Sequence, residues 1–123
     1  MGKTVLLVED EPHIIEALSF LLEQAGWAVH AHSDGGDATE IAASIKPDVV
    51  ILDAMLPNKS GFDILREIRA RPDLNGLPVL MLTAKGQTKD RAAAEAAGAD
   101  LFMTKPFSNQ EIVEAANKLA TTT

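Results

Sequence analysis

Cysteine is absent from these 123 residues, which excludes disulfides, thiolate metal sites and a catalytic thiol. No apolar run is long enough to span a bilayer and no signal-peptide pattern follows Met1, so the sequence predicts a soluble cytoplasmic protein. Basic residues are scarce, with 11 Lys and Arg against 18 Asp and Glu and a net charge of −7. Because phosphate backbones are bound by clustered Lys and Arg, we expect no direct contact with nucleic acid, and no membrane partner.

Short apolar runs alternate with segments of helical spacing along the whole chain. The runs of strand length are Val5–Val8, Ala28–Ala31, Val49–Leu52, Val79–Leu82 and Ala99–Met103. Three of them are continuously apolar, which is typical of parallel strands covered by helices on both faces. The length suits one ordinary domain, so residues 1–123 are predicted to form a single α/β domain: a five-stranded parallel sheet, doubly wound as (βα)5.

Start and stop signals predict the bounds of five helices, one after each strand. The expected segments are about Pro12 to Ala25, from Asp34 or Asp37 to before Pro47, from just after Gly61 to the Arg71-Pro72 break, Thr88 to Ala97, and Ser108 to about Ala120. The fourth is rich in alanine and has few large apolar side chains, so we expect it to be thinly anchored. In the fifth, Ser108 and Glu111 have the spacing of a capping box.

Polar side chains follow four of the apolar runs, at the point where each strand is expected to end. They are Glu9 and Asp10, Asp53, Thr83 and Lys105. Because the carboxyl ends of parallel strands meet at the edge of an open sheet where ligands bind, we expect these side chains to share one rim. Each alone has an ordinary explanation, such as an acid at a helix start, a solvated carboxylate or a surface lysine. Their joint occurrence in this order favours a functional site.

These side chains could support phosphoryl transfer. Close carboxylates repel one another, and a hard divalent cation relieves that repulsion; Mg²⁺ fits best because it takes oxygen ligands and keeps several of its waters. With two carboxylates neutralised, Asp53 could attack a phosphoryl group as a covalent nucleophile. The Lys105 ammonium and the Thr83 hydroxyl could then contact phosphoryl oxygens and stabilise the anionic transition state together with the metal.

Three motifs resemble those of the response-regulator receiver family, over essentially the whole chain. They are Val5-Leu6-Leu7-Val8-Glu9-Asp10-Glu11, Val49-Val50-Ile51-Leu52-Asp53-Ala54-Met55-Leu56-Pro57 and Thr104-Lys105-Pro106-Phe107. The resemblance implies a flavodoxin-like receiver fold, with Asp53 as phosphoacceptor and a bound Mg²⁺, for which Mn²⁺ could substitute. It implies as metal ligands Glu9, Asp10, Asp53 and the backbone carbonyl of Met55. As phosphoryl-binding and switch residues it implies Thr83, Ala84, Lys105 and Phe102, with a cis peptide bond between Lys105 and Pro106.

The same resemblance implies a signalling receiver that assists only its own phosphorylation and dephosphorylation. A histidine kinase or histidine phosphotransfer protein would donate the phosphoryl group, after which Thr83 would move inward and Phe102 would follow. The fourth helix, fifth strand and fifth helix would form the switching face. The cognate kinase and the downstream target are not identified by the sequence, and we expect a monomer or a weak phosphorylation-dependent dimer.

Two departures from the family pattern bear on the subclass. Receivers joined to winged-helix DNA-binding domains typically carry an acidic pair before the switch aromatic and an arginine in the last helix. Here those places are Asp100-Leu101 and Ala115, which favours a stand-alone or differently coupled receiver. Phe102 stands where tyrosine is commoner, so its ring has no hydroxyl with which to form hydrogen bonds.

Other functions remain as alternatives. A Mg²⁺-dependent phosphatase of the haloacid-dehalogenase type also uses an aspartate nucleophile. It requires a second acid two residues after that aspartate, and this chain has Met55 at that position. A flavin or nucleotide binder of flavodoxin type would need a phosphate-cradling glycine loop after the first strand, where Glu9-Asp10-Glu11-Pro12 would repel a phosphate. A receiver-like interaction module that is never phosphorylated is the remaining alternative.

Overall fold

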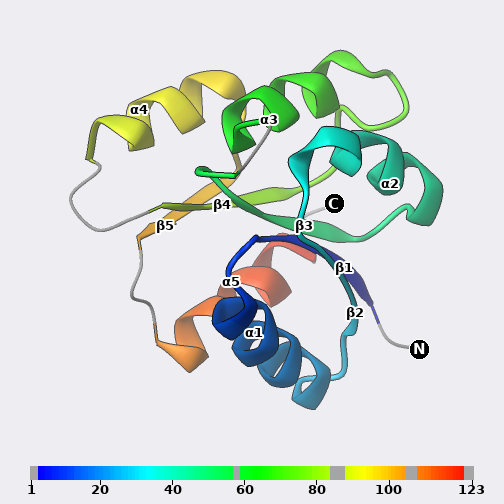
Figure 1. The fold of residues 1–123 in the computed structure, drawn as a ribbon, viewed down its shortest axis with the longest axis vertical. Coiled ribbons are helices and arrows are strands. Elements are labelled where there is room, and N and C mark those ends of the chain that lie inside the picture. The colour runs from blue at the N-terminus through cyan, green and yellow to red at the C-terminus, as the bar shows by residue number, and fades with distance from the viewer. Residues whose placement is uncertain (1–2, 57–58, 84–87, 105–107, 121–123) are drawn as a thin grey trace.

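A computed structural model describes residues 3–56, 59–83, 88–104 and 108–120, with only the backbone described at 88–91 (Figure 1). In chain order the elements are β1 (Thr4–Val8), α1 (Pro12–Gln24), β2 (Ala28–His32), the 3₁₀ turn η1 (Gly35–Asp37), α2 (Ala38–Ile45), β3 (Val49–Asp53), α3 (Gly61–Ala70), β4 (Val79–Thr83), α4 (Thr88–Ala97), β5 (Leu101–Thr104) and α5 (Asn109–Ala120).

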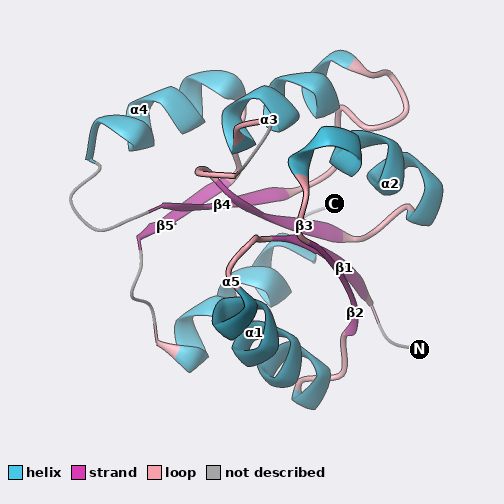
Figure 2. Ribbon diagram, in the orientation of Figure 1, coloured by secondary structure: helices cyan, strands magenta, loops and turns pink. Residues whose placement is uncertain are grey.

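The five strands form one parallel sheet in the order β2-β1-β3-β4-β5. Helices α1 and α5 cover one face of the sheet, and α2, α3 and α4 cover the other (Figure 2). The predicted doubly wound α/β fold is therefore confirmed. The strand order reverses between β1 and β3, which is the place where open α/β sheets bind their ligands.

The apolar strands are buried on both faces, as their composition predicts. In β1, Val5 and Leu7 join the core beneath α1 and α5, while Leu6 and Val8 join the core beneath α2, α3 and α4. Every residue of the central strand β3 is buried, including Asp53 at its end. Packing on two sides thus fixes the position of that carboxylate.

The second helix begins in two stages, so each of its two expected start positions is partly right. The Asp34 carboxylate accepts a hydrogen bond from the Gly36 N–H at 2.9 Å and caps η1, and α2 follows directly after Asp37. The helix ends at Lys46, which takes the left-handed conformation at φ 51° ahead of Pro47. A right-handed helical residue is disfavoured before proline, and the left-handed turn lets the Lys46 N–H bond the Ala42 carbonyl at 2.9 Å.

The last strand begins two residues later than the sequence indicates. Gly98 ends α4 with φ 104°, and the Ala99 N–H still donates to the Ala94 carbonyl at 2.9 Å. Residues 98–100 therefore close the helix before β5 can start at Leu101. The capping box of the fifth helix is confirmed, because the Glu111 N–H donates to the Ser108 hydroxyl at 3.1 Å and the Ser108 N–H to the Glu111 carboxylate at 2.8 Å.

One arginine joins three parts of the chain at the amino end of the sheet. Arg69, in the last turn of α3, donates to the backbone carbonyls of Gly98 and Leu77 at 2.9 and 2.7 Å and to the Asp100 carboxylate at 2.8 Å. The same Asp100 oxygen accepts the Val79 N–H at 2.8 Å. Asp100 is thus engaged within its own chain.

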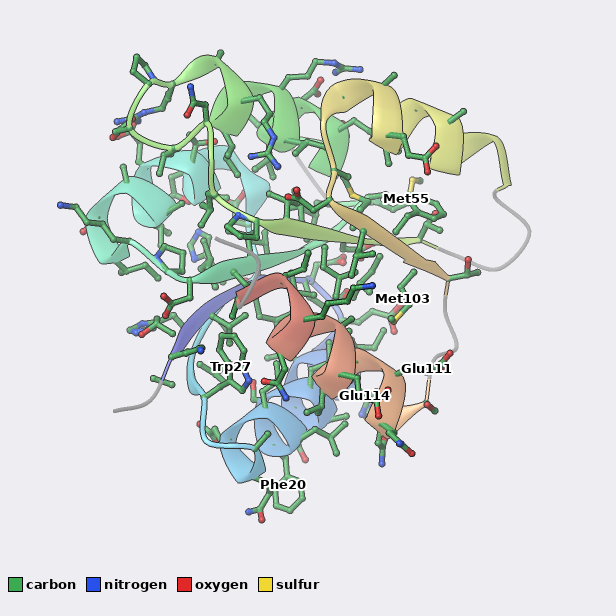
Figure 3. All side chains as sticks on the ribbon, turned by 180° about the vertical axis from the view of Figure 1, so that it is seen from behind. Phe20, Trp27, Met55, Met103, Glu111 and Glu114 are labelled. Atoms are coloured by element: carbon green, nitrogen blue, oxygen red, sulfur yellow. The ribbon has the colours of Figure 1, made fainter. Side chains whose placement is uncertain are left out.

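One large apolar side chain of α1 is exposed. Phe20 is 61% exposed and projects from α1 away from the rest of the molecule (Figure 3). Over the residues that the structure describes, no helix combines the length and the apolar character needed to cross a membrane.

Candidate functional site

Three carboxylates meet at the carboxyl ends of β1 and β3. Glu9 and Asp10 directly follow β1, Asp53 ends β3, and their carboxylate oxygens all lie within 4.8 Å of one another. Glu9 and Asp53 are 0% and 4% exposed, whereas Asp10 reaches solvent. These three residues are named here the acidic cluster. Among the described residues, they are the only group of three or more His, Cys, Asp or Glu side chains that lie close enough together to hold a metal ion. The predicted juxtaposition of these acids is confirmed.

Backbone N–H groups hold the two buried carboxylates in place. One Glu9 oxygen accepts hydrogen bonds from the N–H groups of Asp10 and Glu11, both at 3.1 Å, at the start of α1. The Asp53 carboxylate accepts the Met55 N–H at 3.1 Å. Both acids are therefore oriented by residues that follow them in the chain, where N–H groups favour negative charge.

The start of α3 lies very close to the backbone of Asp53. The Gly61 N–H donates to the Ala54 carbonyl at 3.0 Å, and a Cβ added at Gly61 would lie 2.2 Å from the Asp53 carbonyl oxygen. Only a residue without a side chain fits this approach. Gly61 therefore lets α3 begin directly against the strand end that carries Asp53.

Thr83 and Phe102 lie on adjacent strands and on the same face of the sheet. Thr83 pairs with Thr104, and Met81 pairs with Phe102, so Thr83 and Phe102 are diagonal neighbours across β4 and β5. Thr83 is fully buried at the end of β4, and Phe102 is partly buried against the core beneath α2, α3 and α4. This arrangement fits the expected switch pair.

The other expected site residues divide into two groups. Met55 lies two residues after Asp53 in the chain, and its side chain is 67% exposed (Figure 3). Ala84, Lys105 and Pro106 lie outside the described residues, so the phosphoryl contacts and the cis peptide bond expected there stay predictions.

The donor set suits Mg²⁺. Mg²⁺ binds oxygen ligands and is typically held by one or two carboxylates while it keeps several waters. The acidic cluster supplies three carboxylates, of which the exposed Asp10 faces solvent from which waters can come. A bound cation would also offset the mutual repulsion of these acids.

The sequence does not indicate a group of side chains that joins the β3–α3 connection to two helices. Lys59 lies in the connection from β3 to α3 and forms an ion pair of 2.6 Å with Glu67, whose other oxygen accepts the Thr39 hydroxyl at 2.6 Å. Thr39 and Glu67 are 28 positions apart in the chain, so no local spacing signals the contact.

Fold and site together define a known class of protein. Residues 5–117 match the response regulator receiver domain family, and the chain belongs to that family. It is a receiver domain of the kind used in two-component signalling.

Particular relatives support this membership. The chain is 47% identical over 110 residues to "Probable transcriptional regulatory protein TcrX" of Mycobacterium tuberculosis, a match that covers 89% of this chain and 46% of the relative. The chain thus spans less than half the length of that curated relative. It is 30% identical to the receiver domain of the sensor histidine kinase PA1611 of Pseudomonas aeruginosa, with a TM-score of 0.89 and 98% of each chain covered. That structure holds a magnesium ion coordinated in its active-site cleft. The chemotaxis response regulator CheY4 of Vibrio cholerae is 28% identical, with a TM-score of 0.89 and coverage of 97% of this chain and 99% of CheY4.

Proposed function

We propose that this receiver accepts a phosphoryl group on Asp53 from a histidine kinase or histidine phosphotransfer protein, with Mg²⁺ bound by the acidic cluster. The observation that carries the proposal is the cluster itself, in which a buried acceptor lies within 4.8 Å of two further carboxylates at the switch point of the sheet. The backbone carbonyl of Met55 is the proposed fourth ligand. Mn²⁺, which also takes oxygen ligands, is proposed as a substitute.

In the proposed reaction an Asp53 oxygen attacks the phosphorus of a phosphohistidine. A P–O bond to the carboxylate forms while the P–N bond breaks, and the histidine leaves with the electron pair. Bound Mg²⁺ would supply charge stabilisation for the phosphoryl oxygens. The Met55 N–H already holds one Asp53 oxygen at 3.1 Å and so helps to orient the carboxylate for the attack. Lys105 and Ala84 are proposed to contact the transferred group.

The experiment is incubation with acetyl phosphate and Mg²⁺, followed by intact mass measurement of wild type and Asp53→Asn. We expect a single phosphate adduct on the wild type, no adduct on the variant, and no adduct when a chelator removes the metal. A wild type without an adduct under these conditions would instead favour the unphosphorylated interaction module. Sustained turnover of a generic phosphatase substrate would favour the haloacid-dehalogenase alternative, which the family match weighs against.

We further propose that phosphorylation moves Thr83 and then Phe102, and so alters the face formed by α4, β5 and α5. Their diagonal placement on one face of the sheet supports this coupling. Backbone amide NMR shifts of the phosphorylated and unphosphorylated forms should differ among residues 83–115. Identical shifts across that range would contradict the switch while leaving phosphorylation itself intact.

The remaining expectations stay predictions. A monomer or weak phosphorylation-dependent dimer is supported by the internal engagement of Asp100 with Arg69, because that carboxylate is already paired within its own chain. The single domain over residues 1–123, the cytoplasmic location and a stand-alone or differently coupled output are proposed on the sequence reasoning alone.

A further inference from the structure

The connection between β3 and α3 is tied to the helical layer by charged and polar side chains. The Lys59 ammonium and the Glu67 carboxylate lie 2.6 Å apart, and their side chains are 28% and 41% exposed. The second Glu67 oxygen accepts the Thr39 hydroxyl at 2.6 Å, and Thr39 is itself buried in α2. Lys59, Glu67 and Thr39, named here the Lys59 clamp, therefore join the β3–α3 connection, α3 and α2.

The backbone is close-packed at the same place. The Lys59 ammonium also reaches the Gly36 carbonyl at 3.4 Å. A Cβ on the buried Gly35 would lie 2.7 Å from the Lys59 carbonyl oxygen and 3.0 Å from the Ile64 side chain. The turn η1 and Lys59 of the β3–α3 connection thus lie close together, and the side chains of the clamp lie beside that contact.

Charge assistance strengthens the clamp at neutral pH. Hydrogen bonds from Lys59 and then Thr39 hold the pKa of the Glu67 carboxyl below its usual value of 4.5. A carboxyl with its usual pKa is already charged at neutral pH, and the lowered pKa shows that these two hydrogen bonds favour the charged form; hydrogen bonds between ionised partners are the stronger kind.

Lys59 lies six residues after Asp53 in the chain, so the clamp and the acidic cluster are connected through the backbone. Asp53 is followed by Ala54 and Met55, and the Met55 N–H holds the Asp53 carboxylate at 3.1 Å. Gly61 fixes the far end of the connection against Ala54 at 3.0 Å. Lys59 lies two residues before Gly61, so its tie to Glu67 holds the backbone at residue 59 beside α3.

We propose that the Lys59 clamp positions the β3–α3 connection, and with it the Met55 carbonyl, for Mg²⁺ binding beside Asp53. This inference rests on the proposed function of the acidic cluster. Lys59 is a positioning residue, since it contacts neither the acceptor nor its carboxylate partners among the contacts described above. Residues that orient metal ligands from outside the coordination shell typically change metal affinity by about 10- to 100-fold when mutated.

The test compares Mg²⁺ affinity, measured by isothermal titration calorimetry, in variants whose folding is checked by urea unfolding. Lys59→Met keeps the aliphatic stem and removes the charge, and we expect about 10-fold weaker Mg²⁺ binding. Lys59→Arg keeps the charge and should bind Mg²⁺ like the wild type. Glu67→Gln should weaken Mg²⁺ binding to a similar extent. In the Lys59→Met background it should add little, because both changes remove the same Lys59–Glu67 ion pair.

A matched control and a kinetic readout separate positioning from general stability. Arg66→Met removes an exposed α3 ion pair to Asp63 at 2.9 Å that includes no member of the Lys59 clamp, and it should leave Mg²⁺ affinity unchanged. In Lys59→Met, phosphorylation by acetyl phosphate should slow at low Mg²⁺ and recover at saturating Mg²⁺, since the change acts on metal binding.

Unchanged Mg²⁺ affinity in a folded Lys59→Met variant would overturn the inference and leave the clamp a purely structural contact. If Lys59→Met fails to fold, Thr39→Val is tested in its place, because it removes the hydrogen bond to Glu67. We expect this variant to bind Mg²⁺ more weakly, and unchanged binding would overturn the proposal. A wild type that binds Mg²⁺ but accepts no phosphate would refute the proposed function, whereas the calorimetric comparison would still judge the clamp.

Discussion

Gly61→Ala is expected to destabilise the fold by about 3 kcal/mol and to slow the phosphorylation of Asp53. The new Cβ would lie 2.2 Å from the Asp53 carbonyl oxygen and 2.9 Å from the Ala54 Cα. Both neighbours are backbone atoms in a close-packed region, so no side-chain rotation can relieve the overlap. Either α3 or the end of β3 must shift, and the acceptor moves with the latter. Urea unfolding and the rate of adduct formation measure the two effects.

Two other glycines provide matched controls. Gly76→Ala places its Cβ where no heavy atom lies within 4 Å, and stability should stay the same or rise by roughly 0.5 kcal/mol. Gly26→Ala also meets open space, but Gly26 has φ 98°, so about 1 kcal/mol should be lost through backbone strain without any change in phosphorylation. A Gly61→Ala variant that behaved like Gly76→Ala would show that the close approach to Asp53 is not needed.

Asp10→Asn is expected to stabilise the protein in the absence of Mg²⁺ and to make it less stable than the wild type when Mg²⁺ is present. Without a divalent cation, removing one of three carboxylates within 4.8 Å relieves repulsion, and because Asp10 is exposed the gain should be about 1 kcal/mol. With Mg²⁺, the wild type should become the more stable protein, since the variant lacks one charged ligand. We expect the variant to bind Mg²⁺ on the order of 100-fold more weakly. Thermal unfolding with chelator and across a Mg²⁺ series measures both.

The control for this charge change is Glu23→Gln, at the end of α1 far along the chain from the acidic cluster. Glu23 is exposed and lies outside the cluster, so its variant should respond to Mg²⁺ as the wild type does. Equal stabilisation of Asp10→Asn and wild type by Mg²⁺ would show that Asp10 is not a ligand. A variant no more stable than wild type in chelator would show that repulsion within the cluster is negligible.

The parts of the fold that the sequence predicts well are those encoded by local pattern. The continuous apolar run at 49–52 identifies a strand buried on both faces, and its following acid falls at the strand end as expected. Ser108 and Glu111 signal their helix start by spacing alone, and the structure places both reciprocal hydrogen bonds. The rim of acids follows from topology, because parallel strands bring residues after β1 and β3 to one edge.

The parts that the sequence does not predict depend on contacts between distant segments. The bond between Thr39 and Glu67 and that between Arg69 and Asp100 link residues 28 and 31 positions apart, and neither follows from any periodicity. The late start of β5 depends on how α4 closes at Gly98, where apolar composition alone extends the strand too early. Local chemistry thus locates the acceptor, whereas the contacts that steady its surroundings emerge only once the helices have packed.

The acidic cluster lies at the carboxyl ends of β1 and β3, so its assembly depends on the order in which the protein folds. These strands pair in parallel, and α1, β2, η1 and α2 lie between them in the chain, so the acidic cluster requires a non-local pairing. Pairings of that kind form more slowly than local turns because a long loop must close first. In a newly made chain Asp53 is therefore present before the acidic cluster has assembled, and the proposed phosphoryl transfer has to wait until the sheet has formed.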